Sequence, residues 1–171
     1  MTNTNGRKLV VWGAGGVLLF VCGLVGAQDK DASSDAKKAM SAHYEDLKWQ
    51  AVVPELGSDS PQISILRVDP KSSATQLLIR TPKKMHIPMH WHSANETHTM
   101  ILGTAVFEHE SKRDKLGPGG FNYIPAKMTH QAWTSEGSVV FITVDGAWDV
   151  NWTGNPPSKS DLGQEPPANS N

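Results

Sequence analysis

Hydrophobic and polar positions alternate along most of the middle of the chain. Residues 62–68 carry apolar side chains at roughly every second position, and Asp69-Pro70 follows as a turn. This period of two predicts a strand with one buried face. Residues 75–80, with the apolar run Leu77-Leu78-Ile79 before Thr81-Pro82, are a second predicted strand, and further strands are predicted over 97–103, 104–108, 121–124 and 139–144. Many short strands between Pro and Gly turns predict an all-β fold, a small antiparallel barrel or jelly roll.

The N-terminal segment breaks this pattern. Residues 9–25 carry no charge, follow Arg7 and Lys8, and end at the small-residue sequence Val25-Gly26-Ala27. This arrangement predicts a signal peptide over 1–27, and therefore an exported protein, either periplasmic or extracellular. An uncleaved membrane anchor is the alternative, which several glycines in the apolar run disfavour. We expect no stable membrane insertion once the signal peptide is cleaved.

Two polar segments flank the β region. Residues 28–46 are rich in Ala, Asp, Lys and Ser, which predicts a polar linker or a short helix. Residues 154–171 contain four prolines among Ser, Asn and Gly, which predicts a disordered tail. The folded domain is therefore expected over 47–153, with the basic segment 111–120 as a solvated loop within it.

Composition narrows the chemistry that the domain can perform. The chain has 16 basic and 17 acidic residues, so it lacks the basic excess expected of a nucleic-acid-binding protein. Cys22 is the only cysteine and lies in the predicted signal peptide, so a metal site must use nitrogen and oxygen ligands. Phosphate-binding glycine loops and nucleophile elbows are absent from the sequence.

Three histidines and a glutamate form the candidate metal site. His90 and His92 are two positions apart, so their imidazoles share one face of a strand. The small residues 93–95 allow a bend that brings Glu96 back to the same ion, and His130 supplies a fourth ligand. Imidazole and carboxylate together suit one divalent transition metal ion, namely Fe, Mn, Zn, Ni or Cu, better than Ca or Mg.

These residues resemble the first sequence motif of the cupin superfamily, G-x5-H-x-H-x3-4-E-x6-G. The match is at His90, His92, Glu96 and Gly103, and Lys84 replaces the leading glycine. The resemblance implies a single antiparallel cupin barrel that binds one metal ion and commonly forms a homodimer.

The second cupin motif, G-x5-P-x-G-x2-H-x3-N, also has a counterpart. Gly119, Pro125 and His130 match it, whereas Lys127 and Thr134 replace its second glycine and its asparagine. Neither replacement removes a metal ligand. The two replacements leave open only the local turn geometry at these positions.

The cupin fold hosts many activities, so the resemblance leaves several functions open. We expect an enzyme that acts on a small organic molecule, with a dioxygenase-like oxidoreductase favoured. A lyase is the alternative, because the site, including the small Ala94, is similar in part to that of cupin-type dimethylsulfoniopropionate lyases. A non-catalytic binding or sensing module is also open, and a sugar isomerase lacks its expected basic phosphate-binding groups.

Other polar and aromatic residues receive secondary roles. Glu96 can shift or accept a proton, and His98 has the same strand parity, which makes it a general base or fifth ligand, or a core histidine. Trp133 is expected to line the site, and an inward Tyr123 would hydrogen-bond a substrate or a bound water. His86 is expected at the barrel mouth or in a loop, without a ligand role.

Overall fold

A computed structural model describes residues 8–9 and 38–168 of the chain. The predicted signal peptide, apart from Lys8–Leu9, and most of the predicted linker lie outside the described residues. Among the residues that are described, no helix is long and apolar enough to cross a membrane.

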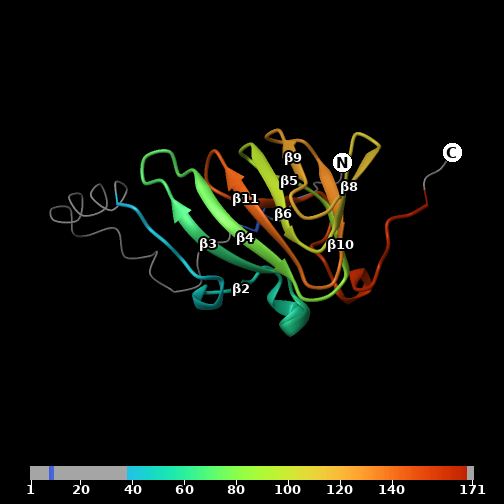
Figure 1. The fold of residues 1–171 in the computed structure, drawn as a ribbon. Coiled ribbons are helices and arrows are strands. Elements are labelled where there is room, and N and C mark those ends of the chain that lie inside the picture. The colour runs from blue at the N-terminus through green and yellow to red at the C-terminus, as the bar shows by residue number, and fades with distance from the viewer. Residues whose placement is uncertain (1–7, 10–37, 169–171) are drawn as a thin grey trace.

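Two six-stranded antiparallel sheets make up the fold (Figure 1). Sheet A has the order β1 (Lys8–Leu9), β12 (Val150–Trp152), β5 (Met85–Trp91), β10 (His130–Thr134), β7 (Ala105–His109) and β8 (Lys112–Leu116). Sheet B has the order β2 (Gln50–Ala51), β3 (Gln62–Val68), β4 (Thr75–Thr81), β11 (Ser138–Val144), β6 (Glu96–Leu102) and β9 (Phe121–Ile124). The predicted all-β antiparallel architecture is confirmed.

The core lies between the two sheets. Alternate residues of the strands are buried there, such as Leu77 of sheet B and Met85 of sheet A, both of which are fully buried. A second, smaller cluster around Met100 and Phe107 fills the other part of the interior. Side chains of both sheets therefore share one interior, and the strand parity decides which residues reach it.

A β-bulge in β5 changes which residues of that strand face the interior. His130 of β10 pairs with His90, but Ala132, two residues on, pairs with Ile87, three residues back. The extra residue of β5 falls beside Pro88, a residue that strands tolerate at bulges because it cannot donate to the ladder. The bulge reverses the parity, so His86 and His90 lie on opposite faces although they are four residues apart.

Two segments expected to lack regular structure contain it. The basic segment 111–120 contains β8, which pairs with β7 along its whole length. The expected disordered tail, residues 154–171, differs from that prediction over its described part. Its 3-10 helix η3 (Lys159–Asp161) begins with a capping box between Ser158 and Asp161, and Leu162 forms a bridge to Met85.

The two remaining 3-10 helices lie on either side of β2. These are η1 (Tyr44–Asp46) and η2 (Pro54–Asp59). The first forms the only regular element in the described part of the predicted linker.

Candidate metal centre

Five polar side chains meet in the interior at one end of the barrel. His90 is the second-last residue of β5, and His92 directly follows that strand. Glu96 and His98 lie on β6, and His130 is the first residue of β10. Each is only 1% to 7% exposed. The structure therefore brings together all four predicted ligands and His98.

The side chains are close enough to share a metal ion. The ring centroid of His90 lies 4.2 Å from that of His130 and 5.0 Å from that of His92. One donor atom each from His90, His92 and His130 lie within 4.8 Å of one another. The same holds for Glu96, His98 and His130, so His130 joins the two groups.

Each of the four histidines uses its Nδ1 atom to donate a hydrogen bond away from the cluster. Three acceptors are backbone carbonyl oxygens and one is a side-chain amide oxygen: Pro88 O at 2.7 Å from His90, Asp149 O for His92, Met128 O at 3.2 Å from His130, and Asn122 Oδ1 at 2.8 Å from His98. A carbonyl oxygen can only accept, so Nδ1 carries the proton and Nε2 keeps a lone pair. This is the arrangement that holds metal-binding imidazoles in place.

The two oxygens of the Glu96 carboxylate have different surroundings: one accepts a hydrogen bond from Trp148, and the other faces His92 and His98. Its Oε1 accepts a hydrogen bond of 3.2 Å from Trp148 Nε1. Its buried Oε2 lies 3.1 Å from His92 Nε2 and 3.2 Å from His98 Nε2, but accepts no hydrogen bond from any described residue. Lone pairs on nitrogen and a carboxylate oxygen repel one another at this distance unless a cation lies between them. The donor set therefore fits a divalent transition metal ion.

Burial and neighbouring charges keep these groups in their metal-binding protonation states. Burial, together with the charges of His130 and His92, holds the pKa of His90 well below its usual value. Burial lowers the pKa of His130 to about 4, with His92 and His98 contributing. Burial opposes ionisation of Glu96, but His98 and His92 outweigh it, so the pKa of this carboxyl lies below its usual range. Near pH 7 His90 and His130 are neutral and Glu96 is ionised.

Hydrogen bonds fix the turn that carries the ligands from sheet A to sheet B. Asp149 accepts from the backbone nitrogen of Ser93 at 2.8 Å and from its hydroxyl at 2.6 Å. Asn95 donates its backbone N–H to Asp145 at 2.9 Å and accepts from the backbone of Ala126 at 2.9 Å. Asp149 thus supports His92 through its carbonyl and the turn through its carboxylate, a role that no spacing in the sequence indicates.

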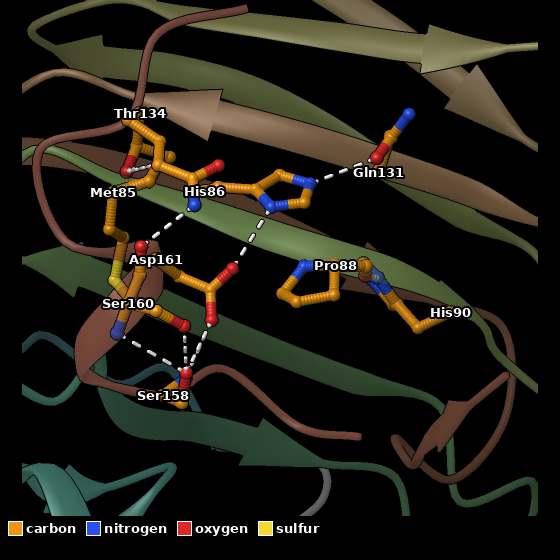
Figure 2. Close-up of polar contacts among 10 residues, drawn as sticks. Met85, His86, Pro88, His90, Gln131, Thr134, Ser158, Ser160 and Asp161 are labelled. Carbon is orange, nitrogen blue, oxygen red and sulfur yellow. Dashed lines mark hydrogen bonds and ion pairs between the residues drawn. The ribbon is translucent and has the colours of Figure 1, made fainter. Parts of the chain in front are cut away.

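His86 lies outside the cluster, on the outer face of sheet A. Figure 2 shows its ring between Asp161 and Gln131, with Nδ1 3.1 Å from Asp161 Oδ1 and Nε2 2.9 Å from Gln131 Oε1. Gln131 donates its amide to Glu108 Oε1 at 2.8 Å, so its oxygen must face His86. Both ring nitrogens therefore face side-chain oxygens. The expectation of a mouth or loop position is wrong, because the β5 bulge turns His86 outward within the strand.

Neither of two aromatic residues considered for the site lies in it. Trp133, which was expected to line the site, stacks on His86 at a centroid distance of 4.9 Å on the outer face, and Tyr123 is 51% exposed. Trp133 follows the inward-facing His130 by three positions, an odd offset, so strand parity would have placed it outside. The indoles that line the site are instead Trp148 and Trp152, whose ring centroids lie 6.1 Å from His92 and 5.1 Å from His90.

A cavity of about 90 Å³ opens beside the five donors. Its wall continues along the barrel interior past Met100 and Phe107 to the hydroxyls of Thr81 and Ser138. The five donors thus lie on the wall of an interior cavity and are themselves buried.

Comparisons of sequence and structure place the chain among known proteins. A family described as "Domain of unknown function (DUF4437)" matches residues 26–151. Among curated proteins, no match is found.

Solved structures with the same fold are cupins and cupin-like enzymes of low sequence identity. An RmlC-like cupin from Shewanella frigidimarina NCIMB 400 is 14% identical, with a TM-score of 0.54 over 64% of this chain and 93% of that one. The polyketide cyclase RemF from Streptomyces resistomycificus is 18% identical, with a TM-score of 0.55 over 69% and 87%. A putative acetylacetone dioxygenase from Methylibium petroleiphilum PM1 is 14% identical, with a TM-score of 0.55 over 71% and 87%.

At this identity the solved structures establish the fold alone, and they agree with the two facing sheets. The expected cupin architecture is confirmed, and the family match covers nearly the whole barrel. The chain belongs to the DUF4437 family and has the cupin fold, with a histidine-rich site that could hold a metal ion.

Proposed function

We propose that the protein binds one divalent transition metal ion through His90, His92, Glu96 and His130, and that it is an enzyme acting on a small organic molecule. A dioxygenase-like oxidoreductase is the favoured activity. One observation carries the proposal: the Nε2 atoms of His92 and His98, whose Nδ1 atoms face acceptors, lie 3.1 Å and 3.2 Å from a buried Glu96 oxygen that accepts no hydrogen bond from the described residues. Similarity in fold to a putative acetylacetone dioxygenase supports this class of reaction.

Different residues around the donor cluster would orient the metal ligands and exclude water. A divalent transition ion supplies Lewis-acid or one-electron chemistry at the donor cluster. The backbone carbonyls of Pro88 and Met128 hold His90 and His130 in one orientation. Trp148 holds one oxygen of Glu96, which directs the other oxygen to the histidines. Apolar walls exclude water from the reacting molecule, which strengthens the electrostatic interactions inside.

A lyase is the second candidate, and His98 supports it. Its Nδ1 is held by Asn122 at 2.8 Å, and its Nε2 lies 3.2 Å from Glu96 on the cavity wall. An Nε2 lone pair at this place can accept a proton from a bound molecule, as a general base does. His98→Gln separates the roles: unchanged metal content with lost turnover identifies a base, and lost metal identifies a ligand.

The proposed site of action is outside the cytoplasm. The charged start, the apolar run and the small-residue site before Gln28 support export with cleavage. N-terminal sequencing of protein recovered from its native compartment would give Gln28 as the first residue. A mature chain that still begins at Met1 would contradict the proposal.

Metal analysis of the purified protein tests the central claim. The wild-type chain is expected to hold about one transition metal ion, and His90→Ala and His130→Ala each to lower its metal affinity by more than about 100-fold. His43→Ala is the matched control, because His43 is exposed and far from the cluster in sequence. Full turnover of a small-molecule panel by metal-free protein would refute the enzyme proposal. Ligand-dependent thermal stabilisation without any product would favour a binding or sensing protein.

A further inference from the structure

The cavity beside the donor cluster has an unusual distribution of polar groups. Its wall is mainly aliphatic and aromatic, with Ile79, Ile87, Met100, Phe107, Val140 and Ile142 among the residues that form it. Apart from the five donors and two tryptophans, its polar side chains are three hydroxyl groups, those of Thr81, Thr134 and Ser138. Ser138 donates to Thr81 at 3.0 Å, so two of these hydroxyls already pair with each other.

Positive charge is missing from this wall. Within the part of the chain that the structure describes, no Lys or Arg lines the cavity. The basic residues that lie nearest in sequence to the wall, such as Arg80 and Lys83, pair with Gln62 and Glu136 elsewhere. An anionic group deep in the cavity would lose its hydration and gain no counter-charge, which costs several kcal/mol.

Trp152 provides an unused hydrogen-bond donor at the donor-cluster end. Its side chain lines the cavity, is 5% exposed and lies against His90. Its Nε1 atom is buried and has no acceptor among the described residues, whereas the neighbouring Trp148 donates to Glu96. A buried indole N–H usually has a partner, so this one is suited to a ligand oxygen.

We propose that the cavity takes a small molecule whose oxygen atoms are confined to one end, at Trp152 and the donor cluster, and whose remainder is uncharged and apolar. This inference rests on the proposed metal site, because the ion would bind the oxygen end. The volume of about 90 Å³ suits a small ligand. The ligand class is therefore a short-chain oxygenated compound with a hydrocarbon tail.

Two five-carbon acids make a matched test. 2-Oxopentanoate and 2-oxoglutarate share the same 2-oxo-carboxylate end and differ only in a terminal methyl against a terminal carboxylate. We expect the Ni(II)-loaded protein to bind 2-oxopentanoate at least about 100-fold more tightly in calorimetric titration. Equal affinities, a preference for 2-oxoglutarate, or binding of neither acid would each overturn the inference.

Two substitutions separate the ends of the ligand. Trp152→Phe keeps the ring against His90 but removes the N–H, so 2-oxopentanoate should bind about 10-fold more weakly while Ni(II) affinity is unchanged.

Thr134 is half-buried on the cavity wall, four residues along β10 from His130, or roughly 13 Å. Thr134→Lys should raise the affinity for 2-oxoglutarate at least about 10-fold, and Thr134→Gln should not. Unaltered selectivity in a folded Thr134→Lys variant would count against the inference.

The design distinguishes this inference from the proposed metal site. Failure of Ni(II) to bind would remove the metal site itself. In that case the metal-free protein is titrated with 2-pentanone, and the methyl NMR signal of Met100 reports binding in the cavity. A shift of this signal supports an apolar pocket. If Ni(II) binds but the protein does not distinguish the two acids, the proposed ligand class is refuted and the metal site stands. An unshifted Met100 signal would likewise refute the proposed ligand class.

Discussion

At the scale of single residues, the site depends on which nitrogen of each imidazole carries the proton. The carbonyls of Pro88 and Met128 and the amide oxygen of Asn122 are pure acceptors, so they fix the proton on Nδ1. The sequence indicates the histidines through their spacing, but the oxygens that orient them come from residues without any motif. Strand parity could predict that the side chains converge, and it could not predict this support.

The pH dependence of folding should reveal the lowered pKa of His130. In the folded, metal-free protein its pKa is about 4, against 6.5 in an unfolded chain, so between these values the unfolded state binds more protons. Stability should therefore fall as the pH drops from 6.5 to 4, by at most about 3 kcal/mol from this residue. Glu96 acts in the same direction, but only below its ordinary value of 4.5.

Urea denaturation of metal-free protein at pH 7, 5.5 and 4.5 measures this effect. His130→Gln cannot titrate and should lose a clear part of the pH dependence. A wild-type protein that gains stability toward pH 4.5 would contradict the expected sign.

Lys127 should be a point of local backbone strain. It replaces a glycine of the cupin motif and adopts a φ of +66°, in the left-handed region that disfavours side chains, while its N–H bonds to His92 O at 2.8 Å. Lys127→Gly is expected to change stability by only a few tenths to about 1 kcal/mol, in the stabilising direction, after the loss of chain entropy is included. Lys127→Ala retains the Cβ atom and should give no such gain in denaturant titration. A larger gain for Ala than for Gly would exclude strain as the cause.

At the scale of elements, hydrogen bonds across sheet A hold the C-terminal segment against the barrel. Asp161 of η3 bonds to His86 of β5, which bonds to Gln131 of β10 (Figure 2). Gln131 in turn donates to Glu108 of β7. Composition alone predicted disorder for this segment, because its prolines and small polar residues leave few apolar contacts. The capping box and the half-buried contact between His86 and Asp161 supply what composition lacks, and the second of these is not visible until β5 is placed beside the tail.

Asp161→Asn should loosen this segment without unfolding the barrel. It removes the carboxylate that faces His86 and half of the capping box, so we expect faster amide hydrogen exchange at Leu162 and Gly163 by about 10-fold or more. Glu165→Gln is the matched control on the same segment, since Glu165 is exposed and its ion pair with Lys84 contributes little. Equal effects of the two substitutions would show that the His86–Asp161 pair does not anchor the segment.

At the scale of the whole molecule, the donor cluster connects the two sheets. His90 and His130 belong to sheet A, and Glu96 and His98 belong to sheet B. The alternation of the sequence predicted both the strands and the shared interior, and the cupin motifs predicted which residues would meet. The bulge beside Pro88 could not be predicted, because register across strands is set by the whole sheet. The outward position of Trp133 could have been predicted from its odd offset from His130.

Metal binding should therefore stabilise the complete fold. An ion present at 100 times its dissociation constant adds about 2.7 kcal/mol to the free energy of unfolding. Chelation should lower the melting temperature and speed hydrogen exchange in both sheets together. Glu96→Gln and His130→Ala should abolish the difference between chelated and loaded protein, whereas His43→Ala should keep it. Destabilisation confined to one sheet would argue against an ion shared by both.

The bulge in β5 has a consequence for insertions and deletions in this family. A deletion of one residue beside Pro88 would restore regular pairing with β10 and exchange the inner and outer positions of the segment before it. His86 would then enter the barrel, and Met85 and Ile87 would leave the core for the surface. A one-residue gap at this place in an alignment would therefore mark a relative with a different set of interior side chains, even where every ligand is retained.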